Sequence, residues 1–154
     1  MAEGTRKFIE DHVLPNSVEK MKSQAFRNER LWTLEVCDLL KANEEGCERI
    51  FKYIKQCADS PDLTTLELND MIFYLVEILG FTGPVNLENI GLAYSLSKQT
   101  IVHEMQDFPN YNDMKKIEFY EFLGRFAELT YEEEIPLVRK LERLMGVMFN
   151  TTIQ

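Results

Sequence analysis

The sequence has few of the residues that catalytic and metal-binding motifs require. Its 154 residues include two histidines and three cysteines. Cys37, Cys47 and Cys57 lie ten residues apart, whereas zinc-binding cysteines come in pairs separated by about two to four residues. A cysteine nucleophile needs a base within reach, and no histidine lies in these segments. No glycine-rich phosphate-binding loop occurs either. We therefore expect a protein that is not an enzyme.

Positive charge and long apolar runs are also scarce. The 17 Lys and Arg residues face 26 Asp and Glu residues, which gives a net charge of −9 and a pI near 4.8. Nucleic acids and anionic lipids both select clustered basic side chains, so we expect neither as a partner. The longest apolar run, 71–79, contains Glu77 and is too short to span a bilayer. The odd cysteine count, with no secretory leader, favours a cytoplasmic location.

Glycine and proline are few and fall between segments with helical periodicity. Apolar residues at helical spacing predict helices over 17–42, 44–57, 64–79, 87–103 and 117–129, and a last helix from about Pro136 to Phe149. Thr64 with Glu67 predicts a capping box, and Asn86 predicts an N-cap. Trp32, the only tryptophan, is expected to be packed, with a binding hot spot as the alternative. No segment has the alternation of a long strand, so we expect an all-α fold.

A weak internal repeat runs through the middle of the chain. Both 51–79 and 87–129 have the order helix, polar turn, short apolar stretch, helix. One such unit cannot bury its apolar face alone, so the two are expected to pair. This divides the chain into an N-terminal segment with a long helix (1–42), a pair of helix–loop–helix units (43–130) and a C-terminal amphipathic helix that packs on the pair (131–154).

The stretch NYNDMKKIEFYEFLGRF, residues 110–126, resembles the second half of an EF-hand loop and its exit helix, as found in the calmodulin superfamily. Together with NEEGCERIFKYI and LTTLELNDMIFYLV, it is similar to degenerate EF-hand modules of ciliary and other cytoskeletal proteins. The resemblance implies a paired EF-hand-like region. It also implies a non-enzymatic structural or adaptor protein whose protein partners belong to a cytoskeletal or ciliary (axonemal) assembly.

An EF-hand loop supplies oxygen ligands at positions 1, 3, 5, 7, 9 and 12, with glycine at position 6 and a bidentate glutamate at position 12. The apolar residue at position 8 faces its counterpart in the paired loop. If Ile117 and Leu66 fill these two positions, Glu121 falls at position 12 of the second loop. Asn110 and Asn112 then fall at positions 1 and 3.

Several residues in this register oppose calcium binding. In the second loop, Met114 at position 5 offers no oxygen, and Lys115 at position 6 adds positive charge. In the first loop, Pro61 and Leu63 occupy ligand positions, and Asp70 falls at position 12. We therefore expect no calcium and no other cofactor. The alternative is a calcium-responsive sensor that uses the loop at 110–121, with the candidate ligands Asn110, Asn112, Glu118 and Glu121.

Two apolar helix faces are candidates for partner binding. The aromatic stripe of the 117–129 helix either packs in the core or lines a groove for a partner helix. The last helix has a broad apolar face and a basic remainder, which suits an acid-rimmed groove. We hypothesise that it folds back into the groove of its own chain; the alternatives are an ordinary packed terminal helix and a helix free to bind another protein. The candidate partner-binding residues are Phe119, Phe122, Phe126, Leu137, Leu141, Leu144, Met145 and Met148.

Overall fold

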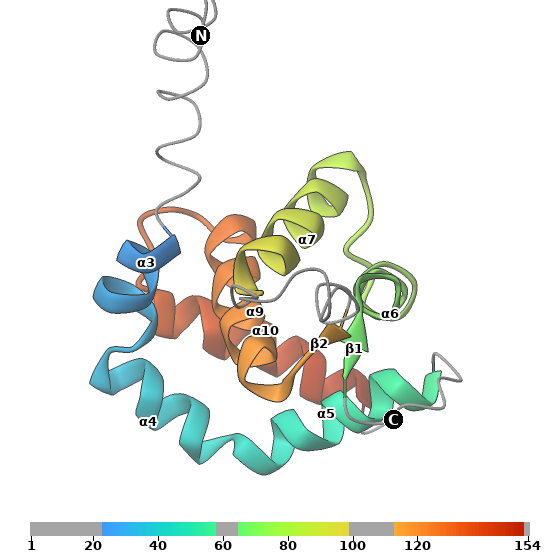
Figure 1. The fold of residues 1–154 in the computed structure, drawn as a ribbon, viewed down its shortest axis with the longest axis horizontal. Coiled ribbons are helices and arrows are strands. Elements are labelled where there is room, and N and C mark those ends of the chain that lie inside the picture. Colours follow the sequence, from blue (N-terminus) through green and yellow to red (C-terminus); the bar gives the residue numbers. More distant parts are fainter. Residues whose placement is uncertain (1–22, 58–64, 99–112, 153–154) are drawn as a thin grey trace, which may run out of the picture.

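The computed structural model describes residues 23–57, 65–98 and 113–152, and these residues are mostly helical (Figure 1). The only strands among them are two residues long, so the all-α expectation is confirmed for this part of the chain. The elements in chain order are α3 (Ser23–Phe26), the π-helix η2 (Arg27–Leu31), α4 (Leu34–Ala42), α5 (Glu44–Cys57), β1 (Leu66–Glu67), α6 (Leu68–Ile72), the π-helix η3 (Phe73–Ile78), α7 (Pro84–Ser97), β2 (Asp113–Met114), α9 (Lys116–Thr130) and α10 (Leu137–Thr152).

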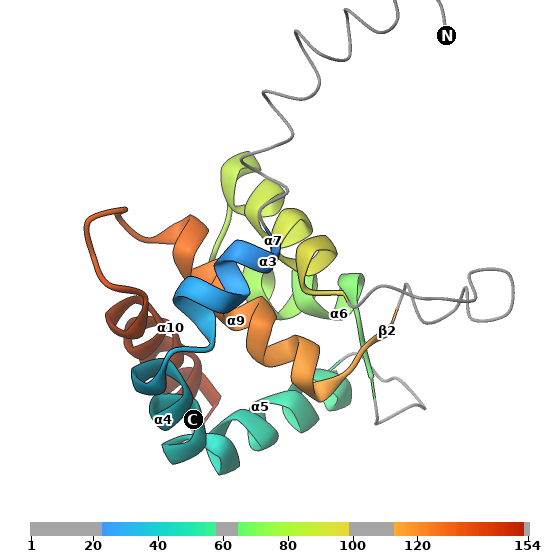
Figure 2. The same ribbon diagram turned by 60° about the vertical axis from the view of Figure 1, so that its left-hand side comes forward.

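Helix α9 runs through the centre of the molecule. Figures 1 and 2 both show it between α7 on one side and α5 on the other, and α10 also packs against it. Every residue from 118 to 127 except Tyr120 is buried. The aromatic stripe explains this position, because Phe119, Phe122 and Phe126 carry large apolar surfaces to α9's neighbours. The ring of Phe119 meets that of Phe51 on α5 edge-on at 5.5 Å.

The two strands form a short antiparallel bridge between the halves of the chain. Leu66 pairs with Met114, and Glu67 pairs with Asp113. Leu66 and Met114 are fully buried. The expected pairing of Leu66 with Ile117 is therefore wrong: Ile117 lies on α9 and is 48% exposed. The helix begins at Lys116, one residue before Ile117, so this apolar residue is already helical and cannot join the bridge.

The helix expected over 17–42 is interrupted; its first residues, 17–22, lie outside the described part. The π-helix η2 ends at Leu31, and α4 starts at Leu34 with Thr33 as its N-cap. The Thr33 hydroxyl accepts a hydrogen bond from the Val36 amide at 3.5 Å, which starts a new helix rather than continuing the old one. Trp32 lies at the break and is 39% exposed, so it is only partly packed.

The helix expected from Thr64 to Leu79 starts later than the sequence predicts, at Leu68. Residues 66 and 67 form β1, because they pair with β2 from the other half of the chain. The capping box joins Glu67 and Asp70, and Thr64, the predicted partner of Glu67, lies outside the described residues. Local capping patterns fit both positions, and the bridge selects the later one.

The boundaries of the other helices are closer to expectation. Helix α5 has the expected bounds, and α9 extends the expected 117–129 by one residue at each end. Helix α7 starts at Pro84 and is capped by Gly83, whose φ of 97° suits glycine, so the predicted N-cap Asn86 is wrong. The expected end of this helix near residue 103 and most of the 107–116 loop lie outside the described residues. In the ranges that the structure does describe, no helix is long and apolar enough to cross a membrane.

Candidate functional site

Two units of the chain have the same construction. The first unit consists of α5, β1 and the α6–η3 helix, and the second consists of α7, β2 and α9. The same interval separates Leu66 from Met114, Glu67 from Lys115, and Asp70 from Glu118. In each unit, therefore, a buried strand residue is followed by a helix cap and then by an acidic residue in the first turn of the exit helix.

Each of these acidic residues caps its own helix. The Asp70 carboxylate accepts a hydrogen bond from the Glu67 amide at 2.9 Å, and the Glu118 carboxylate accepts one from the Lys115 amide at 2.8 Å. Negative charge in the first turn also complements the helix dipole. The caps fix where both exit helices begin, and with them the positions of both carboxylates.

A lysine from the entering helix reaches each carboxylate. Lys55, in the last turn of α5, places its Nζ 3.3 Å from Asp70 Oδ2. Lys98, directly after α7, places its Nζ 3.0 Å from Glu118 Oε2 and also donates to the backbone carbonyl of Asp113. All four side chains are almost fully buried, with exposed fractions of 1% and 11% in the first pair and 7% and 5% in the second.

Both ion pairs are buried, and burial removes the water that would stabilise their charges. An ammonium group loses its hydration when it is buried, and it is tolerated only where oxygens replace the lost water. Lys98 has two such oxygens, the Glu118 carboxylate and the Asp113 carbonyl. Its Nζ also lies 5.9 Å from the centre of the Tyr94 ring, within the range of a cation–π contact.

Tyr94 connects the second lysine site to the first unit. Its hydroxyl donates to the carbonyl of Leu66 at 2.9 Å. Burial, followed by the charges of Asp113 and Glu118, raises the pKa of Tyr94 well above its ordinary value. The hydroxyl therefore stays protonated at neutral pH and remains a hydrogen-bond donor. Together with the strand bridge, this contact holds the two units in one register.

Glu121, expected as a calcium ligand in the sensor alternative, has two cationic partners. Arg27 Nε lies 2.9 Å from its Oε2, and Arg125 Nε lies 2.8 Å from its Oε1. Arg125 in turn covers the Phe26 ring at 4.5 Å. Glu118 is bound by Lys98, so the structure places these two glutamates in different ion-pair clusters. Asn110 and Asn112 lie outside the described residues.

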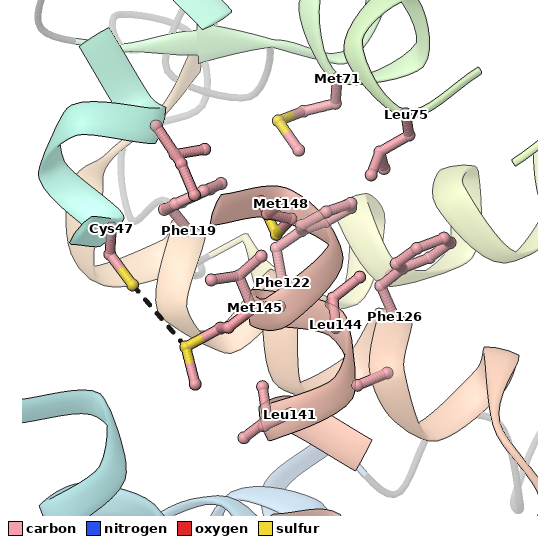
Figure 3. Close-up of a cluster of buried hydrophobic side chains, with 14 of the residues drawn as sticks. Cys47, Met71, Leu75, Phe119, Phe122, Phe126, Leu141, Leu144, Met145 and Met148 are labelled. Carbon is pink, nitrogen blue, oxygen red and sulfur yellow. Dashed lines mark hydrogen bonds between the residues drawn. The ribbon is translucent and has the colours of Figure 1, made fainter. Parts of the chain in front are cut away.

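Figure 3 shows the apolar face of α10 turned toward α9 and α5. The helix also packs on α4. Cys47 Sγ lies 4.0 Å from Met145 Sδ, and a side chain added at Gly46 would come within 2.8 Å of the Phe149 ring. The eight predicted partner-binding residues form a single internal cluster, each 5% exposed or less: Phe119, Phe122, Phe126, Leu137, Leu141, Leu144, Met145 and Met148.

One basic residue of α10 forms its ion pair inside the molecule. Lys140 is fully buried and lies 3.2 Å from Glu128 at the end of α9. Arg30 of η2 pairs with the same Glu128. One acidic residue therefore joins the N-terminal helices, α9 and α10, and helps to hold α10 against the rest of the molecule.

A buried thiol and a shallow pocket lie outside the two lysine sites. Burial raises the pKa of the Cys47 thiol to about 11, which keeps it protonated and unreactive at neutral pH. A shallow pocket of about 250 Å³ is lined by Trp32, Cys37, Leu40, Lys41, Glu44 and Tyr120. Among the residues placed by the structure, no three His, Cys, Asp or Glu side chains gather as a metal-binding group.

Comparisons of the chain with protein-family models, with curated proteins and with solved structures gave no match. The acidic residues Asp70, Glu118 and Glu121 could be recognised in the sequence, but their cationic partners could not. The signal for Lys55 and Lys98 is positional, since each lies at the end of the helix that precedes a loop. The matching positions of these two lysines can be recognised once the pairing of Leu66 with Met114 is known.

Proposed function

We propose that this protein is a non-enzymatic structural or adaptor module, built from two degenerate EF-hand units and independent of calcium. The observation that carries the proposal is the position of α10. A calcium sensor of this class works by exposing an apolar groove to a target helix. Here the groove-forming residues of α9 are covered by α10 of the same chain, whose apolar residues are themselves buried.

The ion pairs support the same proposal. A calcium-responsive loop needs carboxylates that are free to bind the ion. Glu118 and Glu121, the two candidate ligands within the described residues, are bound by Lys98 and by Arg27 with Arg125. Any calcium ion at either glutamate would have to displace a cation that the chain supplies itself. This argues for a module whose shape is set by folding alone.

The resemblance to ciliary and cytoskeletal EF-hand modules supports a protein partner in an assembly of that kind. The eight candidate partner-binding residues are buried in contacts within the chain. A partner of the folded module would therefore contact its outer surface. A partner that bound the eight residues would first have to displace α10, against the Lys140–Glu128 pair and the whole apolar interface.

The experiment that tests this proposal measures apolar surface with and without calcium. The full-length chain is titrated with calcium in magnesium-free buffer while the fluorescence of an apolar dye, such as anilinonaphthalene sulfonate, is recorded. We expect low dye fluorescence and no change up to millimolar calcium. Calorimetry on the same samples should give no heat of binding. A calcium-dependent rise in dye binding, lost in Glu118→Gln or in Glu121→Gln, would establish the sensor alternative instead.

Two triple variants serve as the high and low references for dye binding. Leu141→Gln, Leu144→Gln and Met148→Gln together replace buried residues of α10 and should release the helix, giving strong dye binding in the absence of calcium. Arg139→Gln, Glu142→Gln and Arg143→Gln change exposed residues of the same helix and should leave dye binding low. If both triple variants behaved like the wild type, α10 would not be what covers the groove.

A further inference from the structure

We infer that the ammonium groups of Lys55 and Lys98 take the cation positions of the two EF-hand-like loops, so that the chain carries its own permanent cations where calcium would otherwise bind. This inference rests on the proposed EF-hand architecture and adds a mechanism to it. It explains how the two exit helices can be held in a fixed place without calcium.

The strand bridge sets the register from which this follows. The residues that face each other across the bridge, Leu66 and Met114, take position 8 of the two loops. Position 12, the bidentate acid of a calcium-binding loop, then falls on Asp70 and on Glu118. Position 7, which binds calcium through its backbone carbonyl, falls on Asp113 in the second loop.

Lys98 contacts both of the ligand atoms that this register identifies. Its Nζ lies 3.0 Å from the carboxylate of Glu118, and it donates to the carbonyl of Asp113. These groups correspond to the position 12 and position 7 ligands of a calcium ion. In the first unit, Lys55 Nζ lies 3.3 Å from the position 12 carboxylate of Asp70. The two units therefore repeat one arrangement of a cation against the acid of the exit helix.

The repetition separates this arrangement from an incidental ion pair. Fifteen residues separate Lys55 from Asp70, whereas twenty separate Lys98 from Glu118. The two loops thus differ in length, yet each brings a lysine from the end of its entering helix to the same position of its exit helix. A chance surface pair would be neither duplicated at matching positions nor almost fully buried in both copies.

The described residues suit an ammonium group better than calcium. Calcium takes six to eight oxygens, with several carboxylates. The Asp70 carboxylate lies against Lys55, and the Glu118 carboxylate lies against Lys98, so each ammonium group meets a negative charge. An ammonium group has three donors, which match a carboxylate and a carbonyl. Because it is tethered to the chain, it is also always present, and its charge repels a second cation from the same place.

The consequence is that the exit helices lose their dependence on dissolved cations. In a sensor, filling and emptying the site moves the exit helix. A tethered ammonium group cannot leave while the protein is folded, so α6 and α9 keep one orientation at every calcium concentration. The groove under α10 then stays closed without a signal.

The inference is tested by removing the tethered cation and offering a free one. Lys98→Ala removes the ammonium group and leaves space between Glu118 and Asp113. Terbium, which takes the oxygen ligands of calcium, is added to the full-length chain, and its emission is recorded on excitation of tyrosine. Tyr94 lies beside the Lys98 position and should sensitise terbium bound there. We expect sensitised emission from Lys98→Ala with a Kd of roughly 10⁻⁴–10⁻³ M, the weak end of EF-hand affinities, and none from the wild type.

Three control variants locate the terbium ion. Lys98→Met also removes the charge but fills the space with an apolar chain, so it should bind no terbium. Lys116→Ala removes an exposed lysine from the start of α9 and should behave as the wild type. Adding Glu118→Gln to Lys98→Ala should abolish the emission, because the position 12 carboxylate is then missing.

Each result decides the question. If Lys98→Ala unfolds in chelator, calcium or terbium must restore its helical circular dichroism signal; failure to restore it overturns the inference. Absence of emission from a folded Lys98→Ala, or equal emission from Lys98→Ala and Lys98→Met, overturns it too. In these cases a wild type that is silent toward calcium leaves the proposed function intact. Calcium or terbium binding by the wild type would instead contradict the proposed function itself.

Discussion

The two units contain the same set of polar residues, but their exit helices differ in regularity and in burial. In both, a lysine, a strand residue, a helix cap and an acidic residue follow one another in this order. In the first unit the exit helix changes from α6 to the π-helix η3, and Phe73 on it is 45% exposed. In the second, α9 is one regular helix that is buried along most of its length between α7, α10 and α5.

This difference distinguishes two contributions to the structure, one polar and one apolar. In both units the acidic residue caps its exit helix and pairs with a lysine. The apolar contacts determine how far each exit helix is enclosed, and they favour the second unit. The two contributions can be separated by mutation, because the residues that make them do not overlap.

The largest effect is expected from the apolar centre of the second unit. Phe122 is fully buried and stacks on Phe126 with ring centres 5.8 Å apart. We expect Phe122→Ala to lower the free energy of unfolding by about 3–5 kcal/mol, measured by chemical denaturation. Phe73→Ala in the first unit, where the ring is 45% exposed, should change it by less than about 0.5 kcal/mol. Similar losses at the two positions would contradict the central role of α9.

The lysine sites should rank next. Removing one partner of a buried ion pair leaves an uncompensated charge, which costs about 3–5 kcal/mol. We expect Lys98→Met to fall at the lower end of this range, since both side chains of the pair keep slight contact with solvent. Lys55→Met should cost less, because Asp70 is the most exposed of the four residues at 11%. Chemical denaturation measures both variants.

The control for these two variants is Lys116→Met. Lys116 pairs with Glu48 across α9 and α5, but both side chains are well exposed, so its loss should change stability little. Adding Glu118→Gln to Lys98→Met should recover part of the loss, because the stranded carboxylate is then neutral. If Lys98→Met were as stable as Lys116→Met, the burial of the second lysine site would be in doubt.

A third comparison concerns glycines in the two helices of the second unit. A side chain added at Gly124 on α9 would lie 2.5 Å from Leu31 Cδ1, whereas one added at Gly91 on α7 would meet no atom within 4 Å. We expect Gly124→Ala to destabilise the protein by about 1–3 kcal/mol through overpacking. Gly91→Ala should stabilise it by about 0.5–1 kcal/mol through helix propensity. Thermal melts of the two variants should therefore shift in opposite directions, and a shift in the same direction would contradict the packing around α9.

The smallest effect is expected at the thiols of α5. Cys47 is buried under α10, whereas Cys57 at the end of the helix is partly exposed. Alkylation at pH 8 followed by mass spectrometry should modify Cys57 well before Cys47. Because burial raises the pKa of Cys47 from 9.0 to about 11, the folded state holds the proton more tightly. The contribution of the protonated Cys47 thiol to the free energy of unfolding should therefore be complete below pH 9 and lost as the pH rises through about 11. Equal labelling of both thiols would mean that α10 does not cover Cys47.

The sequence predicted the helical class and most helix positions, because apolar periodicity reports local amphipathicity. It did not predict the bridge register. Ile117 and Met114 are both apolar and only one helical turn apart, so pattern alone could not choose between them. The choice depends on the pairing of Leu66 with a residue far along the chain, which is a tertiary contact. The later start of α6 follows from the same contact.

For the candidate site, the acidic residues were visible in the sequence and their partners were not. Glu121 and Glu118 are carboxylates in a loop-like pattern that the sequence alone shows. Whether they bind calcium or a side chain depends on Arg27 and Lys98, which lie far from them in sequence. The apolar stripes of α9 and α10 were also visible. Their mutual packing follows from the return of the chain after Pro136, which amphipathicity alone does not determine.

The most direct measurement of the central claim observes the lysine ammonium groups themselves. Buried, hydrogen-bonded ammonium protons exchange slowly, so Lys55 and Lys98 should give resolved side-chain ¹H–¹⁵N signals by NMR, assigned with Lys55→Met and Lys98→Met. The account predicts that these signals persist without change when calcium is added in excess. Loss of the Lys98 signal on calcium addition, together with shifts of the α9 amides, would show that calcium displaces the ammonium group and would contradict the account.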